Sequence, residues 1–305
     1  LVRRSTTLDL TPEEVFSLGE AEISRLRSEM ESAMRATGFQ GNLGEFIQSL
    51  RSETRFYAPD LPTYVEKASE VGKRADALLP RFFGKLPRLT WGIRRKPPEL
   101  EGSSSGYDPG NPAQGVSGSV VVGSNSYLDP LFSLPAWVLH EGVPGHHLQI
   151  ALAQERTDLP EFRRLDDITA FVEGWALYAE QLGDEMGIYR DPYERFGKLS
   201  FDMWRACRLV MDVGVHWHGW TAEQAATCLR ENTTLPEVRL QYETDRYIAW
   251  PAQALAYKVG ELRFLKLRRE AEQKLGPRFD IRAFHDELLD EGTMPLSVLE
   301  QRIRQ

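Results

Sequence analysis

The residues from Leu134 to the end of the chain repeat their apolar side chains at helical spacing with few interruptions. Recurrence every three to four positions is typical of helices with one apolar face. The same pattern follows Thr11, where Pro12 and two acids indicate a helix start. The sequence therefore predicts a mainly α fold. The expected helices begin after Thr11 and continue over residues 43–50, 62–79, 134–154, 160–187, 192–218, 221–230, 236–249, 251–272, 280–289 and 295–303.

One segment, residues 81–133, departs from this pattern. Its first part, residues 81–117, holds five Pro and six Gly, which favour turns and loops. Residues 118–124 read Gly-Ser-Val-Val-Val-Gly-Ser, and such a short β-branched run predicts a strand. We expect one continuous domain in which residues 1–80 form an N-terminal helical segment. The loop-rich segment 81–133 then carries a small β element, and residues 134–305 form a second helical region.

Charge and cysteine content exclude several classes of protein. Thirty-seven basic and 45 acidic residues give a net charge of −8, which argues against a nucleic-acid surface. No apolar run approaches the roughly 20 residues of a membrane span. Cys207 and Cys228 are too few for a disulfide scaffold and lack the spacing of paired metal ligands. The chain begins at Leu1 without a Met or an apolar signal, as a fragment or a processed form would. A cytoplasmic location is slightly favoured, and an exported protein that has lost its signal also fits.

Three histidines and a glutamate lie within eight residues, in His140-Glu141-Gly142-Val143-Pro144-Gly145-His146-His147. Neutral imidazoles are common zinc ligands, and a catalytic zinc takes three protein ligands and leaves one position open. Glu141 directly follows the first histidine, where its carboxylate can take a proton from a metal-activated water. The octet therefore predicts a catalytic metal site.

The spacing of these histidines differs from the familiar His-Glu-x-x-His helix. In an unbroken helix, the sixth residue after His140 would lie on another face and the seventh about 10 Å further along the axis. Pro144-Gly145 can break the helix and return the chain towards His140. We favour His146 as the second ligand, with His147 as the alternative.

A third ligand is expected from a following helix. Glu173 and Glu180 lie seven residues apart on one face of a strongly apolar stretch. Carboxylates on such a stretch are seldom buried unless they are paired or bound to metal. Pairing with Arg205 or Arg208 is the structural alternative. With the octet present, Glu173 is the preferred third ligand, and Glu180 is expected to orient a histidine ring.

The chain resembles a bacterial family catalogued as domain of unknown function 885. The resemblance rests on the octet, on Glu-Gly-Trp-Ala-Leu-Tyr-Ala-Glu at 173–180, and on similar segments at 208–216, 251–260 and 279–285. Members are usually about twice as long, so the chain matches their C-terminal half, and a partner chain or a homo-oligomer could supply the rest. The family signature is similar to that of gluzincin metallopeptidases. This resemblance implies a helical gluzincin-like catalytic domain with a small β element before the His-Glu helix.

The resemblance also implies residue roles. Zinc would be held by His140, His146 and Glu173, with Glu141 as the general base. Gluzincins place a Tyr or His to stabilise the oxyanion, and Tyr247 stands where that residue is expected, with Tyr257 as the second choice. In the resembling peptidases an edge strand pairs with the substrate, which would put Asn125 at the end of strand 118–124.

Two further interpretations come from spacing and charge. Arg208, Asp212 and His216 recur every four residues and so share one helical face. They form either an ion-pair stripe or a group beside the site, with His216 in a catalytic role and Asp212 behind it. Arg246 is either a surface salt-bridge residue or a bidentate clamp for a substrate carboxylate.

The sequence as a whole predicts a zinc-dependent hydrolase that cleaves peptide or amide bonds in small substrates. Iron, manganese or cobalt would suit the same ligands. The first alternative is a metal-dependent enzyme of another class, for example one that oxidises a small amide-like metabolite with iron. The second is a non-catalytic subunit that binds a metal or a peptide.

Overall fold

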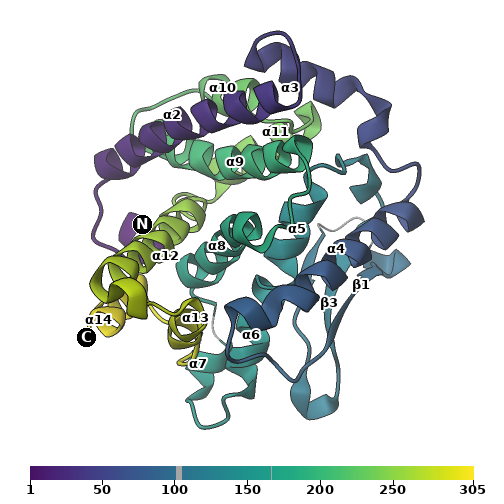
Figure 1. The fold of residues 1–305 in the computed structure, drawn as a ribbon. Helices are drawn as coiled ribbons and strands as arrows, with labels where there is room; N and C mark the ends of the chain where they lie inside the picture. Colours follow the sequence, from purple (N-terminus) through teal and green to yellow (C-terminus); the bar gives the residue numbers. More distant parts are fainter. Residues whose placement is uncertain (101–104, 166) are drawn as a thin grey trace.

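The computed structural model describes residues 1–100, 105–165 and 167–305, and it is mainly helical (Figure 1). Its three short strands are β1 (Trp91–Arg95), β2 (Gly106–Asp108) and β3 (Gly118–Val122). The α-helices are α1 (Val2–Thr6), α2 (Pro12–Ala36), α3 (Leu43–Ser52), α4 (Leu61–Phe82), α5 (Leu134–Glu141), α6 (His146–Glu155), α7 (Glu161–Leu165), α8 (Thr169–Met186), α9 (Pro192–His216), α10 (Ala222–Asn232), α11 (Glu237–Ala249), α12 (Leu255–Leu275), α13 (Ile281–Leu289) and α14 (Leu296–Arg304).

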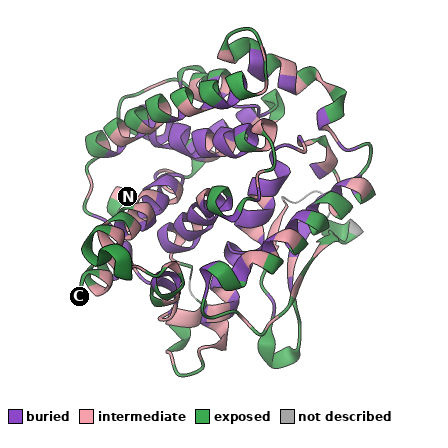
Figure 2. Cartoon of the chain, viewed as in Figure 1, coloured by how far each residue is buried: buried purple, intermediate pink, exposed green. Residues whose placement is uncertain are grey.

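Helix α8 lies at the centre of the molecule and packs against α5, α6, α9 and α12, while α2 runs along α9 (Figure 1). These central helices carry most of the buried surface, and the outer faces of α2, α3 and α4 are exposed (Figure 2). The main hydrophobic core takes side chains from α4, β3, α5, α8, α12 and the two C-terminal helices. Residues of all three segments expected from the sequence therefore contribute to one core.

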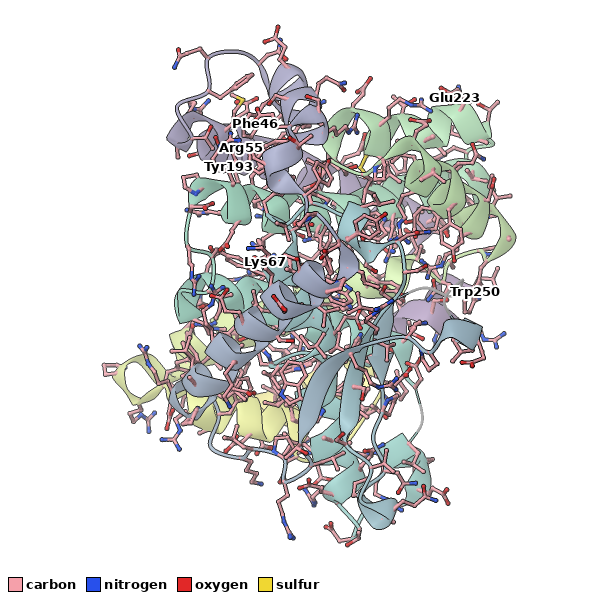
Figure 3. All side chains as sticks on the ribbon, turned by 90° about the vertical axis from the view of Figure 1, so that its right-hand side faces the viewer. Phe46, Arg55, Lys67, Tyr193, Glu223 and Trp250 are labelled. Carbon is pink, nitrogen blue, oxygen red and sulfur yellow. A yellow bond between two sulfur atoms is a disulfide. The ribbon has the colours of Figure 1, made fainter. Side chains whose placement is uncertain are left out.

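A second core joins α2, α3, α9, α10 and α11. Figure 3 shows three side chains beside one another at the edge of this core: Phe46 of α3, Tyr193 of α9, and Arg55 from the turn after α3. The Phe46 and Tyr193 rings stack with centroids 6.2 Å apart, and the Arg55 guanidinium lies 5.1 Å from the Tyr193 ring. Cys207 of α9 and Cys228 of α10 form a disulfide within this core. This disulfide was not expected from the sequence, in which the two cysteines show no recognisable pairing pattern.

Local signals explain several of the helix starts. Thr11 and Thr221 cap α2 and α10 with complete capping boxes, and Asp280 accepts a hydrogen bond from the backbone of Arg282 at the start of α13. Two expected helices were wrong as continuous elements: 134–154 is divided into α5 and α6, and 160–187 into α7 and α8. The helix expected over 251–272 begins later, at Leu255, because Ala252 has a left-handed backbone conformation.

The small sheet has the strand order β1-β3-β2. β1 pairs with β3 in parallel, from Trp91 opposite Gly118 to Arg95 opposite Val122, and β2 pairs with β3 antiparallel. The predicted strand at 118–124 is confirmed as β3. However, it is the central strand, so the expectation that its edge is free to bind substrate was wrong. In the described residues β1 and β2 are the edges, and the sheet contacts α4 and α6.

In the described part of the chain, no helix is both long enough and apolar enough to span a membrane.

Candidate metal centre

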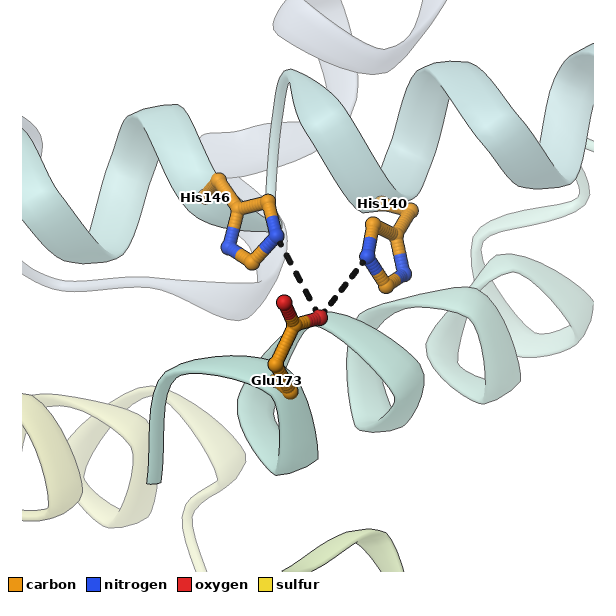
Figure 4. A group of neighbouring side chains, drawn as sticks. All are labelled: His140, His146 and Glu173. Carbon is orange, nitrogen blue, oxygen red and sulfur yellow. Dashed lines mark ion pairs between the residues drawn. The ribbon is translucent and has the colours of Figure 1, made fainter. Parts of the chain in front are cut away.

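The ends of three helices bring His140, His146 and Glu173 together (Figure 4). His140 lies in the last turn of α5, His146 is the first residue of α6, and Glu173 lies in the second turn of α8. Oε2 of Glu173 is 3.3 Å from Nε2 of His140 and 3.6 Å from Nε2 of His146. One donor atom from each residue falls within 4.8 Å of the others.

The reversal between α5 and α6 creates this arrangement. The backbone N–H of Gly145 donates to the carbonyl of Leu139 at 2.9 Å, and that of His147 donates to Gly142 at 3.0 Å. A Cβ at Gly145 would overlap the carbonyls of Leu139 and His140, so the turn requires glycine. The two ligand candidates then stand side by side, with the rings of His140 and His146 4.7 Å apart at 85°.

Helix α8 is fixed in position on both sides of Glu173. A Cβ at Gly174 would lie 2.6 Å from the backbone of Gly260, so α8 and α12 meet there without side chains between them. On the other side, the indole N–H of Trp175 donates to the carbonyl of Pro144 at 2.8 Å, in the turn between α5 and α6. The Glu173 carboxylate is therefore held against the histidine turn by rigid elements.

Glu180 lies about two turns after Glu173 on the same side of α8, where its carboxylate contacts the first histidine. Its Oε1 is 2.8 Å from Nδ1 of His140, and Nη2 of Arg205 lies 3.6 Å from the same oxygen. The Nδ1–H donates to this carboxylate, so Nε2 of His140 is left as an acceptor facing Glu173. The structure thus brings Glu180, the residue expected from the sequence to orient a histidine ring, into contact with His140.

Facing acceptors in a buried site require a cation or a proton between them. Oε2 of Glu173 makes no hydrogen bond within the described part of the chain. Burial lowers the pKa of His140, but Glu173 and Glu180 outweigh burial and raise that pKa to about 9. Burial opposes ionisation of Glu173, yet His140 and His146 hold its pKa well below the ordinary value. The three groups thus form a site that favours positive charge between them.

The donor set fits a divalent metal ion. Zinc bound at ~2.0–2.1 Å with tetrahedral angles separates its ligand atoms by about 3.3 Å. The separations of Glu173 Oε2 from the two ring nitrogens, 3.3 and 3.6 Å, are close to this value. Two imidazoles and one carboxylate would hold such an ion through three protein ligands, the number found at catalytic zinc sites.

Glu141 lies beside the donor set. Burial raises its pKa, whereas the neighbouring His140 and His146 lower it by a smaller amount. A Cβ at Gly106, the first residue of β2, would lie 3.9 Å from Oε2 of Glu141, so this carboxylate faces the small sheet. A carboxylate whose pKa is raised is better suited to accept a proton near neutral pH.

His147, the alternative ligand in the sequence analysis, lies on the far side of the turn. Its Nδ1 is 2.9 Å from the hydroxyl of Tyr107, and its Nε2 is 3.1 Å from the carbonyl of Leu89. The ring stacks on Trp91 with centroids 5.7 Å apart. Burial lowers the pKa of His147 to about 4. Both ring nitrogens contact the sheet region, so this structure places His146, and not His147, with His140.

The two candidate tyrosines differ in position. The hydroxyl of Tyr247 donates to Glu243 at 2.6 Å and accepts from Trp204 at 2.9 Å and from Arg208 at 2.7 Å. Its donor is already used in a buried network, so the first choice for the oxyanion-stabilising role does not match the structure. The reason is that α11 turns Tyr247 towards α9 rather than towards the metal centre.

Tyr257, the second choice, is affected by the charge of the ligand candidate Glu173. Burial and then the negative charge of Glu173 raise the pKa of its hydroxyl. Arg208 and Arg246 act in the opposite direction on the same pKa. Tyr257 therefore lies within electrostatic range of both the ligand carboxylate and two arginines.

His216 and Asp212 hold the chain around α11 and do not join the donor set. His216 Nε2 is 2.9 Å from the carbonyl of Tyr247. Oδ2 of Asp212 accepts from the N–H of Ala252 at 2.8 Å, and burial raises the pKa of Asp212 to about 6. The structure thus gives both residues structural contacts in place of the catalytic and supporting roles expected for them.

Asn125 and Arg246, the two other residues expected to contact the substrate, lie in different surroundings. Asn125 follows β3, is exposed, and makes no capping hydrogen bond to the turn that follows. Arg246 is half-buried and contacts Glu243 at 3.4 Å, Gln253 at 2.6 Å and Tyr257 at 3.3 Å. It is therefore not a simple surface ion pair.

Asp167 is a neighbour of the site that was not predicted from the sequence. Burial and then the charge of Glu173 raise its pKa, so it lies near the ligand carboxylate. It stands in the turn before α8, outside any helical repeat, and no spacing rule could have assigned it. The strand β2 was also not predicted, because its three residues are too few for a detectable alternation.

Comparison with known proteins agrees with the resemblance seen in the sequence. A family model described as "Bacterial protein of unknown function (DUF885)" matches residues 1–303. The chain belongs to the DUF885 family. Among curated proteins, none matches this DUF885 chain.

Two solved structures share the fold of this DUF885 chain. The crystal structure of a "putative lipoprotein" from Colwellia psychrerythraea superposes with a TM-score of 0.93 at 33% identity, covering 99% of the chain and 53% of that protein. A "putative lipoprotein of unknown function" from Shewanella oneidensis gives 0.81 at 20% identity, covering 99% and 58%. The chain thus spans little more than half the length of these two relatives.

Proposed function

We propose that this DUF885 chain is a zinc-dependent hydrolase of the gluzincin type that cleaves peptide or amide bonds. The observation that carries the proposal is the grouping of His140, His146 and Glu173 with donor atoms within 4.8 Å, next to Glu141. Two histidines flanking a glutamate base, with a carboxylate ligand from a later helix, are the chemical parts of a metal-dependent hydrolase.

Each protein group has a defined task in this reaction. A divalent metal, when bound, polarises the substrate carbonyl and acidifies water. Glu141 accepts the proton of the attacking water and passes it to the leaving amine as the C–N bond breaks. Glu180 keeps His140 in the tautomer that presents Nε2. The raised pKa of Glu141 favours both of its proton transfers at neutral pH.

Tyr257 is the preferred donor to the developing oxyanion, in place of Tyr247. Its hydroxyl lies in the electrostatic field of Glu173, and its pKa is raised, so the proton remains available for donation. For the extended substrate, β2 is the better edge than β3. β3 is paired on both sides, whereas β2 is an edge of the described sheet and begins beside Glu141.

Metal content tests the proposal first. Protein purified without added metal is expected to hold about one zinc ion per chain by elemental mass spectrometry. His140→Ala, His146→Ala and Glu173→Ala should lose the metal, and His147→Ala should retain it. His216→Ala serves as a second control, since its ring contacts the backbone of Tyr247.

Activity provides the second test. The zinc-loaded protein should hydrolyse members of a peptide library, and Glu141→Gln should bind zinc but lose hydrolysis. Iron in place of zinc, with substrate-dependent oxygen uptake, would favour the oxidative alternative. Absence of metal after reconstitution with zinc and with iron would contradict the hydrolase.

A further inference from the structure

Two arginines, Arg208 of α9 and Arg246 of α11, share one carboxylate. Oε2 of Glu243 lies 3.2 Å from Nη2 of Arg208 and 3.4 Å from Nη1 of Arg246. Glu243 also accepts from Tyr247, and Arg208 and Arg246 keep its pKa low although burial opposes this. Two positive charges face one negative charge, so this cluster carries an excess of positive charge.

Arg208 has a hydrogen-bonding group left over. The residue is only 3% exposed, yet its Nη1 has no partner among the described residues. The guanidinium lies against the rings of Trp204 and Tyr257, at 4.7 and 4.3 Å from their centroids. Buried polar groups are nearly always hydrogen-bonded, and an unpartnered guanidinium nitrogen favours an anionic acceptor.

Tyr257 connects this cluster with the metal centre. Its hydroxyl contacts Nη2 of Arg246 at 3.3 Å, its ring lies against Arg208, and the charge of Glu173 acts on it. Arg246 is the more accessible arginine, with 21% of its side chain exposed. Trp250, which directly follows the last residue of α11, is largely exposed (Figure 3).

We propose that Arg208 and Arg246 bind the free α-carboxylate of a substrate whose scissile amide lies at the metal centre. This inference rests on the proposed hydrolase function and names its substrate class: peptides with a free C-terminus, or N-acyl amino acids. Planar guanidinium groups bind carboxylates in bidentate fashion, which suits a substrate held at one end. Water adds to the amide carbonyl carbon, the C–N bond breaks, and the terminal amino acid leaves with the proton.

Paired substrates test this inference. Zinc-loaded protein is given benzoyl-glycyl-phenylalanine, its C-terminal amide, and benzoyl-phenylalanine. The free acid should be cleaved with a kcat/KM higher than that of the amide by roughly 10- to 100-fold, as expected for a hydrogen bond to a charged group. Cleavage of benzoyl-phenylalanine would indicate N-acyl amino acids, and cleavage of the acyl dipeptide alone would indicate peptides.

The variant Arg246→Gln should slow cleavage of the free acid more than cleavage of the amide, so that the ratio of their kcat/KM values falls towards one. Arg35→Gln, an exposed arginine of α2 that pairs with Glu31, is the matched control and should keep the preference. Equal cleavage of acid and amide by the unaltered protein would overturn the inference while leaving the hydrolase intact. That comparison needs no variant, so it holds even if Arg246→Gln fails to fold.

Binding distinguishes failure of the inference from failure of the proposed function. Zinc-loaded Glu141→Gln is titrated calorimetrically with benzoyl-glycyl-phenylalanine and with its amide. Tighter binding of the acid, lost in the double variant with Arg246→Gln, would support the carboxylate site even without turnover by the parent protein. Equal or absent binding of the two compounds would overturn it.

Discussion

Oε1 of Glu180 lies 2.8 Å from Nδ1 of His140, and both side chains are buried on facing helices, α8 and α5. Arg205, 3.6 Å from the same carboxylate, balances its charge. This contact decides which nitrogen of His140 faces Glu173. It therefore couples residues that contact no metal to the strength of the metal site.

Replacing Glu180 by Gln should weaken zinc binding roughly 10- to 100-fold, because the amide orients the imidazole without the carboxylate's charge. Competition with a chromophoric chelator measures the change. Glu185→Gln, on the same helix but paired with Arg268 at the surface, is the matched control. An unchanged affinity in Glu180→Gln would show that the contact has no role in metal binding.

Zinc affinity should depend on pH through His140. Its pKa is raised to about 9 in the metal-free protein, so at lower pH a proton must leave before Nε2 can bind a metal. Apparent affinity should rise up to about pH 9 and fall towards acid, by up to about tenfold per pH unit for each displaced proton. Proton release on zinc addition, followed in weakly buffered solution, checks the sign. No release at neutral pH would contradict the protonated histidine.

Replacing Tyr257 and Tyr247 by Phe should have different effects, one on kcat and the other on the free energy of unfolding. Tyr257→Phe should lower kcat roughly 100- to 1000-fold with little loss of folding stability, because it removes an oxyanion donor. Tyr247→Phe should lower the free energy of unfolding by about 1–3 kcal/mol, because it leaves Glu243 short of a buried donor. Steady-state kinetics and urea unfolding measure the two effects. The reverse outcome would restore Tyr247 as the catalytic candidate.

The crossing of α8 and α12 should not tolerate a side chain at Gly174. A Cβ there would lie 2.6 Å from the backbone of Gly260, so Gly174→Ala must separate the helices. We expect a loss of about 1–3 kcal/mol in the free energy of unfolding, as for other overpacked cores, with weaker metal binding because Glu173 shifts. Gly44→Ala, at an exposed position of α3, is the control. Equal unfolding midpoints for the two variants would refute the close contact.

The Cys207–Cys228 disulfide should contribute about 3 kcal/mol to the free energy of unfolding, the value expected for a closed loop of this length. Its cysteines are 21 residues apart and join α9 to α10. Thermal unfolding with and without reductant measures the effect, and Cys228→Ser should abolish the dependence on reductant. Two free thiols in protein purified under oxidising conditions would show that the bond does not form.

Local sequence signals predicted the helical architecture because they act within one turn. The caps Thr11, Thr221 and Asp280 each bond to backbone two or three residues away, so their helices start where the sequence indicates. The break at Pro144-Gly145 is also local. Its exact path, which sets His146 beside His140, depends on a backbone reversal that composition alone does not specify.

Tertiary features were less accessible from the sequence. β1 and β2 are stabilised by pairing with β3, which lies elsewhere in the chain, and they have only five and three residues. Tyr247 and Tyr257 lie in similar helical surroundings along the chain. Only the packing of α11 against α9 shows that Tyr247 is enclosed by Trp204 and Arg208.

Because of the break between α5 and α6, a bound metal ion would connect separate elements of the fold. Within one continuous helix, the pitch alone sets the distance between two ligands, whatever happens elsewhere. Here His140, His146 and Glu173 belong to three separate helices. A bound ion would therefore act as a cross-link between them, and amide hydrogen exchange in all three helix ends should slow together when it binds.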